Sequence, residues 1–165
     1  SEPGVPEGTY GIQEIVTDAL SIPPCQYGEV LWGEDGSISY ATRAVDVSAW
    51  ARKNGSTNPD LLDFEDWSYR YIQKLISDQI RGVVKNLRAD VEHSMAAAYA
   101  GVYIDYYAGR EIDVKGIKST KGYRFWERNM PDSYLIRELD AMIADSDGDN
   151  NYFLLPEEEG WMTGD

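Results

Sequence analysis

The sequence predicts one mainly helical α+β domain with two small β-hairpins. The chain has 165 residues, close to the size of one ordinary domain. Hydrophobic residues make up 42% of it and aromatic residues 12%, enough for a packed core despite a formal net charge of -14. Residues 59–108 carry apolar side chains at helical spacing. We therefore expect a helical core accompanied by short strands.

The N-terminal segment predicts an arm, a short helix and a hairpin. Residues 1–9 hold two prolines and two glycines with almost nothing apolar, which is typical of an extended arm. Residues 11–20 carry apolar side chains at helical spacing, and the prolines that follow end this predicted helix. Residues 30–32 and 38–40 favour β-structure and flank the turn-rich quartet 33–36, which predicts the first hairpin.

The middle of the chain predicts a short helix at about 43–53 and then a long helical region at about 59–108. Asn58 is a favoured N-cap, and Pro59 suits the first helical position. The apolar track advances by roughly 3.8 residues per step, so its stripe drifts around a straight helix. An unbroken helix would span roughly 75 Å, longer than a compact domain of this size. We expect a break near Gly82 or at residues 88–90, whereas a continuous rod would indicate an assembly.

The last third predicts a second hairpin, a helix and a tail. Apolar and polar residues alternate in 111–114 and again in 123–126, which predicts two short antiparallel strands. Residues 132–144 carry apolar side chains at helical spacing after Pro131. The globular domain is therefore expected over residues 10–151. Residues 152–165 form an acidic, aromatic tail.

The charge balance argues against two classes of partner. Lys and Arg number 15 against 29 Asp and Glu, so the field around the chain repels phosphate backbones and anionic lipids. We expect no direct nucleic-acid binding and no membrane association, since no apolar run is long enough to span a bilayer. A soluble protein of the cytoplasm or of a virion fits this composition. Simple solubility, a salty environment and mimicry of a polyanion all remain open as explanations of the charge.

One loop carries a candidate metal site. Asp145, Asp147 and Asp149 stand at positions 1, 3 and 5 of a loop after a predicted helix, which resembles the start of an EF-hand or dockerin calcium loop. Asn150 replaces the usual glycine, and Pro156 stands where a bidentate acid belongs. The competing interpretation is a solvated turn rich in Asp, Gly and Asn. Apart from calcium at this loop, we expect no cofactor.

No set of residues identifies a reaction. His93 is the only histidine and Cys25 the only cysteine, so neither an intrachain disulfide nor a Cys-based zinc site can form. Nucleophilic catalysis by Cys25 or a serine would have to use His93 as its base. A single Asp90–His93 pair is too little for a di-iron centre. We therefore assign no catalytic residue.

The aromatic composition predicts a protein interface. The chain has 12 Tyr and 5 Trp but 3 Phe, and side chains with an apolar body and a polar tip are enriched at interfaces. Four tyrosines gather at the end of the long helical region, beside alanines and a glycine that permit close helix approach. The alternative is that these tyrosines complete the edge of the core. The predicted interface residues are Tyr99, Tyr103, Tyr106, Tyr107, Phe153, Leu154 and Trp161.

Three functions are compatible with these observations. The first is a non-enzymatic structural or interaction protein that forms part of a larger assembly by self-assembly or with protein partners, such as a phage connector or a minor capsid protein. The second is an acidic inhibitor that mimics nucleic acid and binds a host nucleic-acid-binding protein. The third is an enzyme that uses carboxylates or bound calcium. The aromatic excess, the two arm-like termini and the missing catalytic set favour the first.

Overall fold

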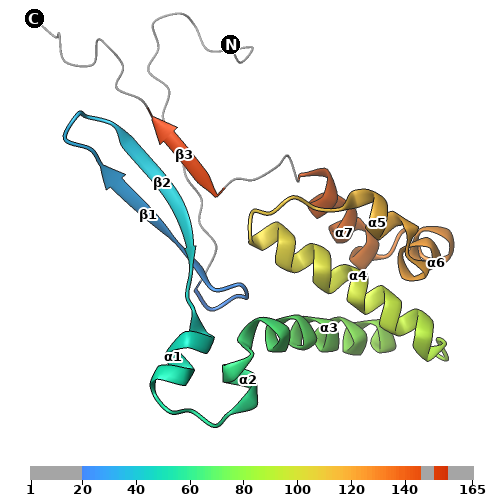
Figure 1. Ribbon diagram of the computed structural model, residues 1–165. Helices are drawn as coiled ribbons and strands as arrows, with labels where there is room; N and C mark the ends of the chain where they lie inside the picture. Colours follow the sequence, from blue (N-terminus) through green and yellow to red (C-terminus); the bar gives the residue numbers. More distant parts are fainter. Residues whose placement is uncertain (1–19, 146–150, 156–165) are drawn as a thin grey trace, which may run out of the picture.

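The computed structural model describes residues 20–145 and 151–155, and it is mainly helical with one antiparallel sheet (Figure 1). Seven helices lie between the second and third strands of the described chain. In order the elements are β1 (Gln26–Trp32), β2 (Ile38–Ala44), α1 (Val47–Lys53), α2 (Pro59–Leu62), α3 (Phe64–Val83), α4 (Ala89–Tyr107), α5 (Val114–Ser119), α6 (Lys121–Asn129), α7 (Tyr134–Ala144) and β3 (Tyr152–Leu155).

The sheet has the order β1-β2-β3, and both pairings are antiparallel. The predicted first hairpin is confirmed, and each strand is longer than expected because residues 26–29 pair with residues 41–44. Residues 152–155, which we assigned to the tail, form the third strand beside β2. Figure 1 shows the sheet standing beside the helices, and no described helix lies along either of its faces.

The predicted long helical region is broken, as its drifting apolar stripe indicated. A single turn, α2, ends at Leu62, and α3 and α4 are separated by a short loop between the two expected break points. Within this loop Asn86 has a φ of 59°, a left-handed conformation that Asn tolerates better than most residues. The two helices fold back on each other, and Arg81 Nη2 lies 2.8 Å from Glu92 Oε1 across the turn.

The core surrounds α4, which contacts α3, α6 and α7. Because three helices pack around it, α4 buries seven residues on several of its sides. By contrast, α3 buries a single stripe, at Ser68, Ile72, Ile76 and Ile80. The largest fully buried side chains of the described chain are Trp126, Ile80, Met95, Leu139 and Val102.

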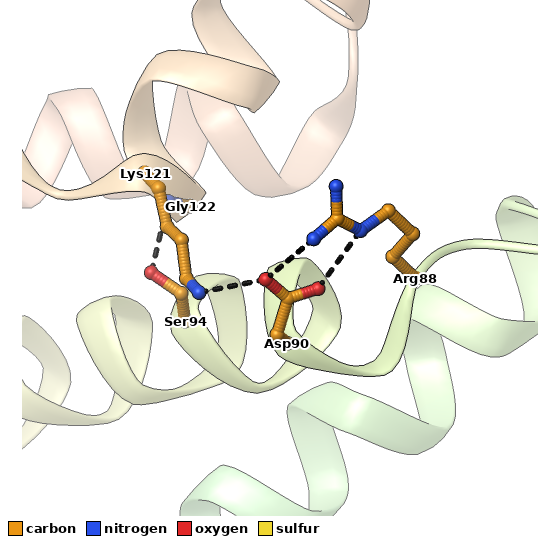
Figure 2. A network of polar contacts seen from close by, with 5 residues as sticks. All are labelled: Arg88, Asp90, Ser94, Lys121 and Gly122. Carbon is orange, nitrogen blue, oxygen red and sulfur yellow. Dashed lines mark hydrogen bonds and ion pairs between the residues drawn. The ribbon is translucent and has the colours of Figure 1, made fainter.

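A polar network fixes the start of α6 against the first turns of α4 (Figure 2). The Gly122 amide donates to Ser94 Oγ at 2.9 Å, and Lys121 Nζ lies 2.8 Å from Asp90 Oδ2. Arg88 donates to both carboxylate oxygens of Asp90 at 3.1 Å. The Lys121 hydrogen bond lowers the pKa of Asp90, and Arg88 adds to this shift. The side chains of Arg88, Asp90 and Lys121 are exposed, and exposed ion pairs contribute little to stability. The close packing of the buried Gly122 against α4 therefore contributes most to this contact.

The prediction of a second hairpin is wrong, because residues 114–119 and 121–129 form α5 and α6. Each helix begins at a capping side chain. Asp113 accepts from the Gly116 amide at 2.9 Å, and Thr120 accepts from the Tyr123 amide at 3.2 Å. The helical spacing of Tyr123 and Trp126 places both rings in the core.

Two other helices differ from their predicted bounds only at the start. The helix expected at 43–53 begins at Val47, because β2 extends to Ala44 and Asp46 caps the helix. The helix expected at 132–144 begins at Tyr134. The predicted arm 1–9, most of the helix at 11–20 and residues 156–165 of the tail lie outside the described residues. Of the helices within the described ranges, none combines the length and apolar character that crossing a bilayer requires.

Candidate interaction surface

β1 lies at an edge of the sheet, and the hydrogen bonds show which of its backbone groups face outward. The Gly33 amide donates to the Ser37 carbonyl at 2.8 Å, and the Val45 amide donates to the Cys25 carbonyl at 3.1 Å. Bonded pairs in an antiparallel ladder occur at every second residue, so the odd-numbered residues of β1 bond β2. The amides and carbonyls that point away from β2 belong to Gln26, Gly28, Val30 and Trp32.

The other side of β2 shows the complementary pattern. The Thr42 amide donates to the Asn151 carbonyl at 2.9 Å, so the even-numbered residues of β2 bond toward β3. β2 is therefore paired with β1 along its length and with β3 from Ile38 to Ala41. Within the described part of the chain, no strand pairs with the outer edge of β1.

The outer end of β1 is apolar and exposed. Val30 is 60% exposed, Leu31 57% and Trp32 77%. Natural proteins usually protect an edge strand with lysine, proline or a bulge, because open backbone groups pair with other chains. The segment Gln26–Trp32 contains neither lysine nor proline. This end of β1 therefore combines backbone groups that bond no described strand with the exposed apolar area that is typical of a protein-binding edge.

The turn after β1 holds this end of the strand in place. Asp35 Oδ1 accepts from the Ser37 amide at 3.0 Å and from the Ser37 hydroxyl at 2.6 Å, and these bonds lower the pKa of Asp35. Gly36 has a φ of 84°, which a residue with a side chain rarely adopts. Glu34 and Asp35 thus place two negative charges beside Trp32, so the apolar end of the strand has an acidic border.

The structure places the predicted tyrosine cluster at the boundary of the core. Tyr99 is 3% exposed and its hydroxyl donates to Glu138, so it is a core residue. Tyr103 and Tyr106 are partly buried against the core, and the ring centroids of Tyr103 and Tyr107 lie 4.5 Å apart. An interface at the three outer tyrosines stays a prediction. Of the remaining residues assigned to the interface, Phe153 and Leu154 lie in β3 and Trp161 lies outside the described residues.

The predicted calcium loop lies almost entirely outside the described residues, which include Asp145 but neither Asp147 nor Asp149. Asp145 accepts a hydrogen bond from the Tyr106 hydroxyl at 2.7 Å, and this bond raises the pKa of Tyr106. Over the ranges 20–145 and 151–155, no group of three His, Cys, Asp or Glu side chains could hold a metal ion. The calcium hypothesis stays a prediction.

The two residues considered for nucleophilic chemistry lie in ordinary surroundings. His93 is exposed on α4, where its Nδ1 lies 3.2 Å from Gln73 Nε2. Cys25 is a buried cysteine just before β1. Its φ of 60° belongs to the bend that leads into the strand.

Sequence reasoning predicted β1 as a strand but did not reveal that its outer end is exposed. The signal was the run Val30-Leu31-Trp32, which departs from the alternation of a strand with one buried face. Such a run is equally typical of a strand buried on both faces. The order of the strands in the sheet decides between the two cases, and the sequence does not reveal that order.

Comparison with known proteins places the helical part of the chain in a family. No curated protein matches the chain. The family model described as the C-terminal domain of cyclic nucleotide phosphodiesterase matches residues 46–149, more than half of the chain. The match begins at the N-cap of α1 and includes every described helix, whereas all three strands lie outside it. The chain belongs to the family of C-terminal domains of cyclic nucleotide phosphodiesterase.

Proposed function

We propose that this protein is an interaction subunit of a larger assembly that binds an extended segment of a partner protein at the open edge of β1. The observation that carries the proposal is the outward-facing backbone of Gln26, Gly28, Val30 and Trp32 beside exposed apolar side chains. In strand addition, backbone hydrogen bonds supply affinity, and the side chains of alternate residues supply specificity. The sheet, and with it this surface, lies outside the residues that the family model matches.

The chemistry of β1 indicates what the partner segment should look like. Apolar side chains at alternate positions would cover Val30 and Trp32, which point to the same face of the sheet. Basic residues should flank the segment, because the chain carries a net charge of -14 and Glu34 and Asp35 border the edge. Opposite charge speeds encounter and disfavours acidic competitors. A nucleic-acid mimic would also attract basic partners, but it would need no strand-like segment.

The first test uses a synthetic peptide of alternating Val and Thr with Lys at both ends, added to the full chain. Hydrogen exchange of the backbone amides is the measurement. In the free protein we expect the amides of Gly28, Val30 and Trp32 to exchange quickly, because they point to solvent, and those of Glu29 and Leu31 to be protected by β2. Peptide binding should protect the first set. A peptide with proline at alternate positions, which cannot complete the ladder, is the control.

The Val30→Lys substitution should weaken peptide binding by about tenfold or more, because it loses apolar contact with the partner and adds a charge that protects the edge. Val30 is 60% exposed, so the fold should be unaffected. Val83→Lys is the matched control, since Val83 is 65% exposed at the end of α3. Equal binding by both variants, or fast exchange at Gly28, Val30 and Trp32 with saturating peptide, would contradict strand addition.

If copies of the chain paired with each other through this edge, the amides of Gly28, Val30 and Trp32 would be protected from exchange without any peptide. Light scattering over a range of protein concentrations separates this case, because protection would then rise with oligomer mass. The mutual repulsion of strongly acidic copies would make such association tighter at high salt. Binding of a basic partner should instead weaken as salt rises.

The family name supports phosphodiesterase activity as a second candidate function. His93 is the only histidine and hence the first residue to test as a general acid or base. Its neighbour Glu92 is held by Arg81 at 2.8 Å. Hydrolysis of cyclic nucleotides by the full chain, with His93→Gln as the comparison, tests this candidate. Turnover by the wild type that the substitution abolishes would establish it, whereas no turnover would leave the interaction proposal untouched.

A further inference from the structure

A pocket of about 590 Å³ lies where the segment before β1, the first helices and the end of α4 meet. Pro23 and Pro24 contribute one wall, and residues 44–48 and 62–65 contribute others. Ile104 and Arg110 line it from the end of α4 and the loop that follows. Its volume is typical of sites for small molecules. None of the residues singled out for chemistry in the sequence lies in it.

Charged groups of both signs line this pocket without pairing with each other. Arg52 Nη1 donates to the Leu62 carbonyl at 3.1 Å, and the other donors of its guanidinium have no described partner. Asp63 and Glu65 line the pocket and form no ion pair with any described residue. Arg110 pairs with Asp105, which lies outside the lining. The pocket thus offers separate positive and negative groups to a ligand.

Ser68 supplies a second, independent observation. It lies on the buried stripe of α3, is 4% exposed and lines the pocket. Its Oγ is buried and has no hydrogen-bond partner among the described residues. A buried hydroxyl without a partner costs free energy, so such groups are rare unless water or a ligand bonds them. A ligand oxygen in the pocket would accept a hydrogen bond from this hydroxyl.

We propose that this pocket binds a small zwitterion, a free amino acid or a dipeptide with an apolar side chain. Its carboxylate accepts hydrogen bonds from the guanidinium of Arg52 and from the Ser68 hydroxyl. Its ammonium group lies near Asp63 and Glu65, and its side chain contacts the apolar wall that includes Phe64. This site includes only the first residue of β1, Gln26, and not Val30 or Trp32, so the two proposals can fail independently.

Calorimetric titration of the full chain with four probes tests the charge requirement. The probes are L-leucine, glycyl-L-leucine, N-acetyl-L-leucine, which lacks the ammonium group, and L-leucinamide, which lacks the carboxylate. We expect at least one of the first two to bind and each single-charge analogue to bind about tenfold more weakly or worse. No binding of leucine or glycyl-leucine below about 10 mM, or equal binding of the analogues, would overturn the proposal.

Substitutions assign the site to these residues. Ser68→Ala should weaken zwitterion binding by about tenfold and also raise the melting temperature of the free protein, because it removes an unpaired buried hydroxyl. Arg52→Gln should weaken binding at least as much, whereas Arg128→Gln, at an exposed arginine on α6, should leave it unchanged. Undiminished binding by Ser68→Ala would overturn the assignment. The higher melting temperature of this variant rules out misfolding as the cause of lost binding.

Discussion

Gly122→Ala is expected to lower the free energy of unfolding by about 3 kcal/mol, a large part of the stability of a small domain. A Cβ on Gly122 would lie 2.4 Å from both the Met95 nitrogen and the Ser94 carbonyl carbon. These are backbone atoms of α4, so relief requires the two helices to separate. Separation would break the Gly122–Ser94 hydrogen bond and loosen the packing of Tyr123 and Trp126. Urea denaturation followed by circular dichroism measures the effect.

Gly101→Ala is the matched control for this prediction. Gly101 lies within α4, and a Cβ there would meet nothing within 4 Å. Alanine should therefore stabilise the helix by up to about 1 kcal/mol. Opposite signs at the two glycines are expected. If Gly122→Ala proved as stable as the wild type, α4 and α6 would not approach each other as closely as described.

High pH is expected to destabilise the protein steeply, because two buried tyrosines must keep their protons in the folded state. Burial raises the pKa of Tyr99, and the hydrogen bond to Glu138 raises it further. Burial and the hydrogen bond to Asp140 at 2.6 Å raise the pKa of Tyr123 in the same way. The unfolded chain releases these protons near pH 10, so above that pH the folded state binds more protons. The free energy of unfolding should then fall by roughly 1.4 kcal/mol per pH unit for each tyrosine.

Urea midpoints between about pH 8 and pH 11 test this dependence. Below about pH 10 the contribution of both tyrosines is fully present, so the midpoint should be nearly constant there. The double variant Tyr99→Phe, Tyr123→Phe should lose less stability above pH 10, although it is less stable at neutral pH because two carboxylates lose a donor. Tyr71→Phe, at a residue that is 43% exposed, is the control for the loss of a tyrosine hydroxyl as such. If the urea midpoint fell equally steeply above pH 10 in the double variant and in the wild type, Tyr99 and Tyr123 would not be the cause of the pH dependence.

The helical core follows from the sequence because its signals are local. Asn58 and Pro59 start a helix where they were expected to, and the drift of the apolar stripe predicted a break before α4. The position of the loop, with Asn86 in a left-handed conformation, depends on how α3 and α4 meet. The spacing of the apolar residues therefore predicts only the general region of the break.

The error at residues 111–126 has a physical cause. A segment as short as residues 123–126 fits both patterns. Tyr123 and Phe125 alternate with a polar residue as in a strand, whereas Tyr123 and Trp126 lie three residues apart, as on one face of a helix. The caps decide between the two patterns. Asp113 and Thr120 are good N-cap residues, and both bond the amide three residues later. These two capping residues are the sequence signals that indicate both helices.

The candidate sites were less accessible from sequence than the fold. The open edge of β1 depends on β3, which comes from the far end of the described chain. The pocket brings Arg52, Ser68 and Arg110 together from three segments, and none of them belongs to a motif. Long-range contacts of this kind leave no periodic pattern in the sequence.

The origin of β3 also determines when the sheet can be completed during synthesis. β1 and β2 leave the ribosome before the helices, whereas β3 emerges only after α7. A hairpin alone is marginally stable in water, so until β3 arrives β2 also has an unpaired edge. In a nascent chain the β2 edge is therefore open, whereas in the finished sheet β3 covers it and becomes the second edge strand beside β1 at the other side. Partner molecules or chaperones present during translation therefore meet the backbone of β2, which is closed in the finished sheet.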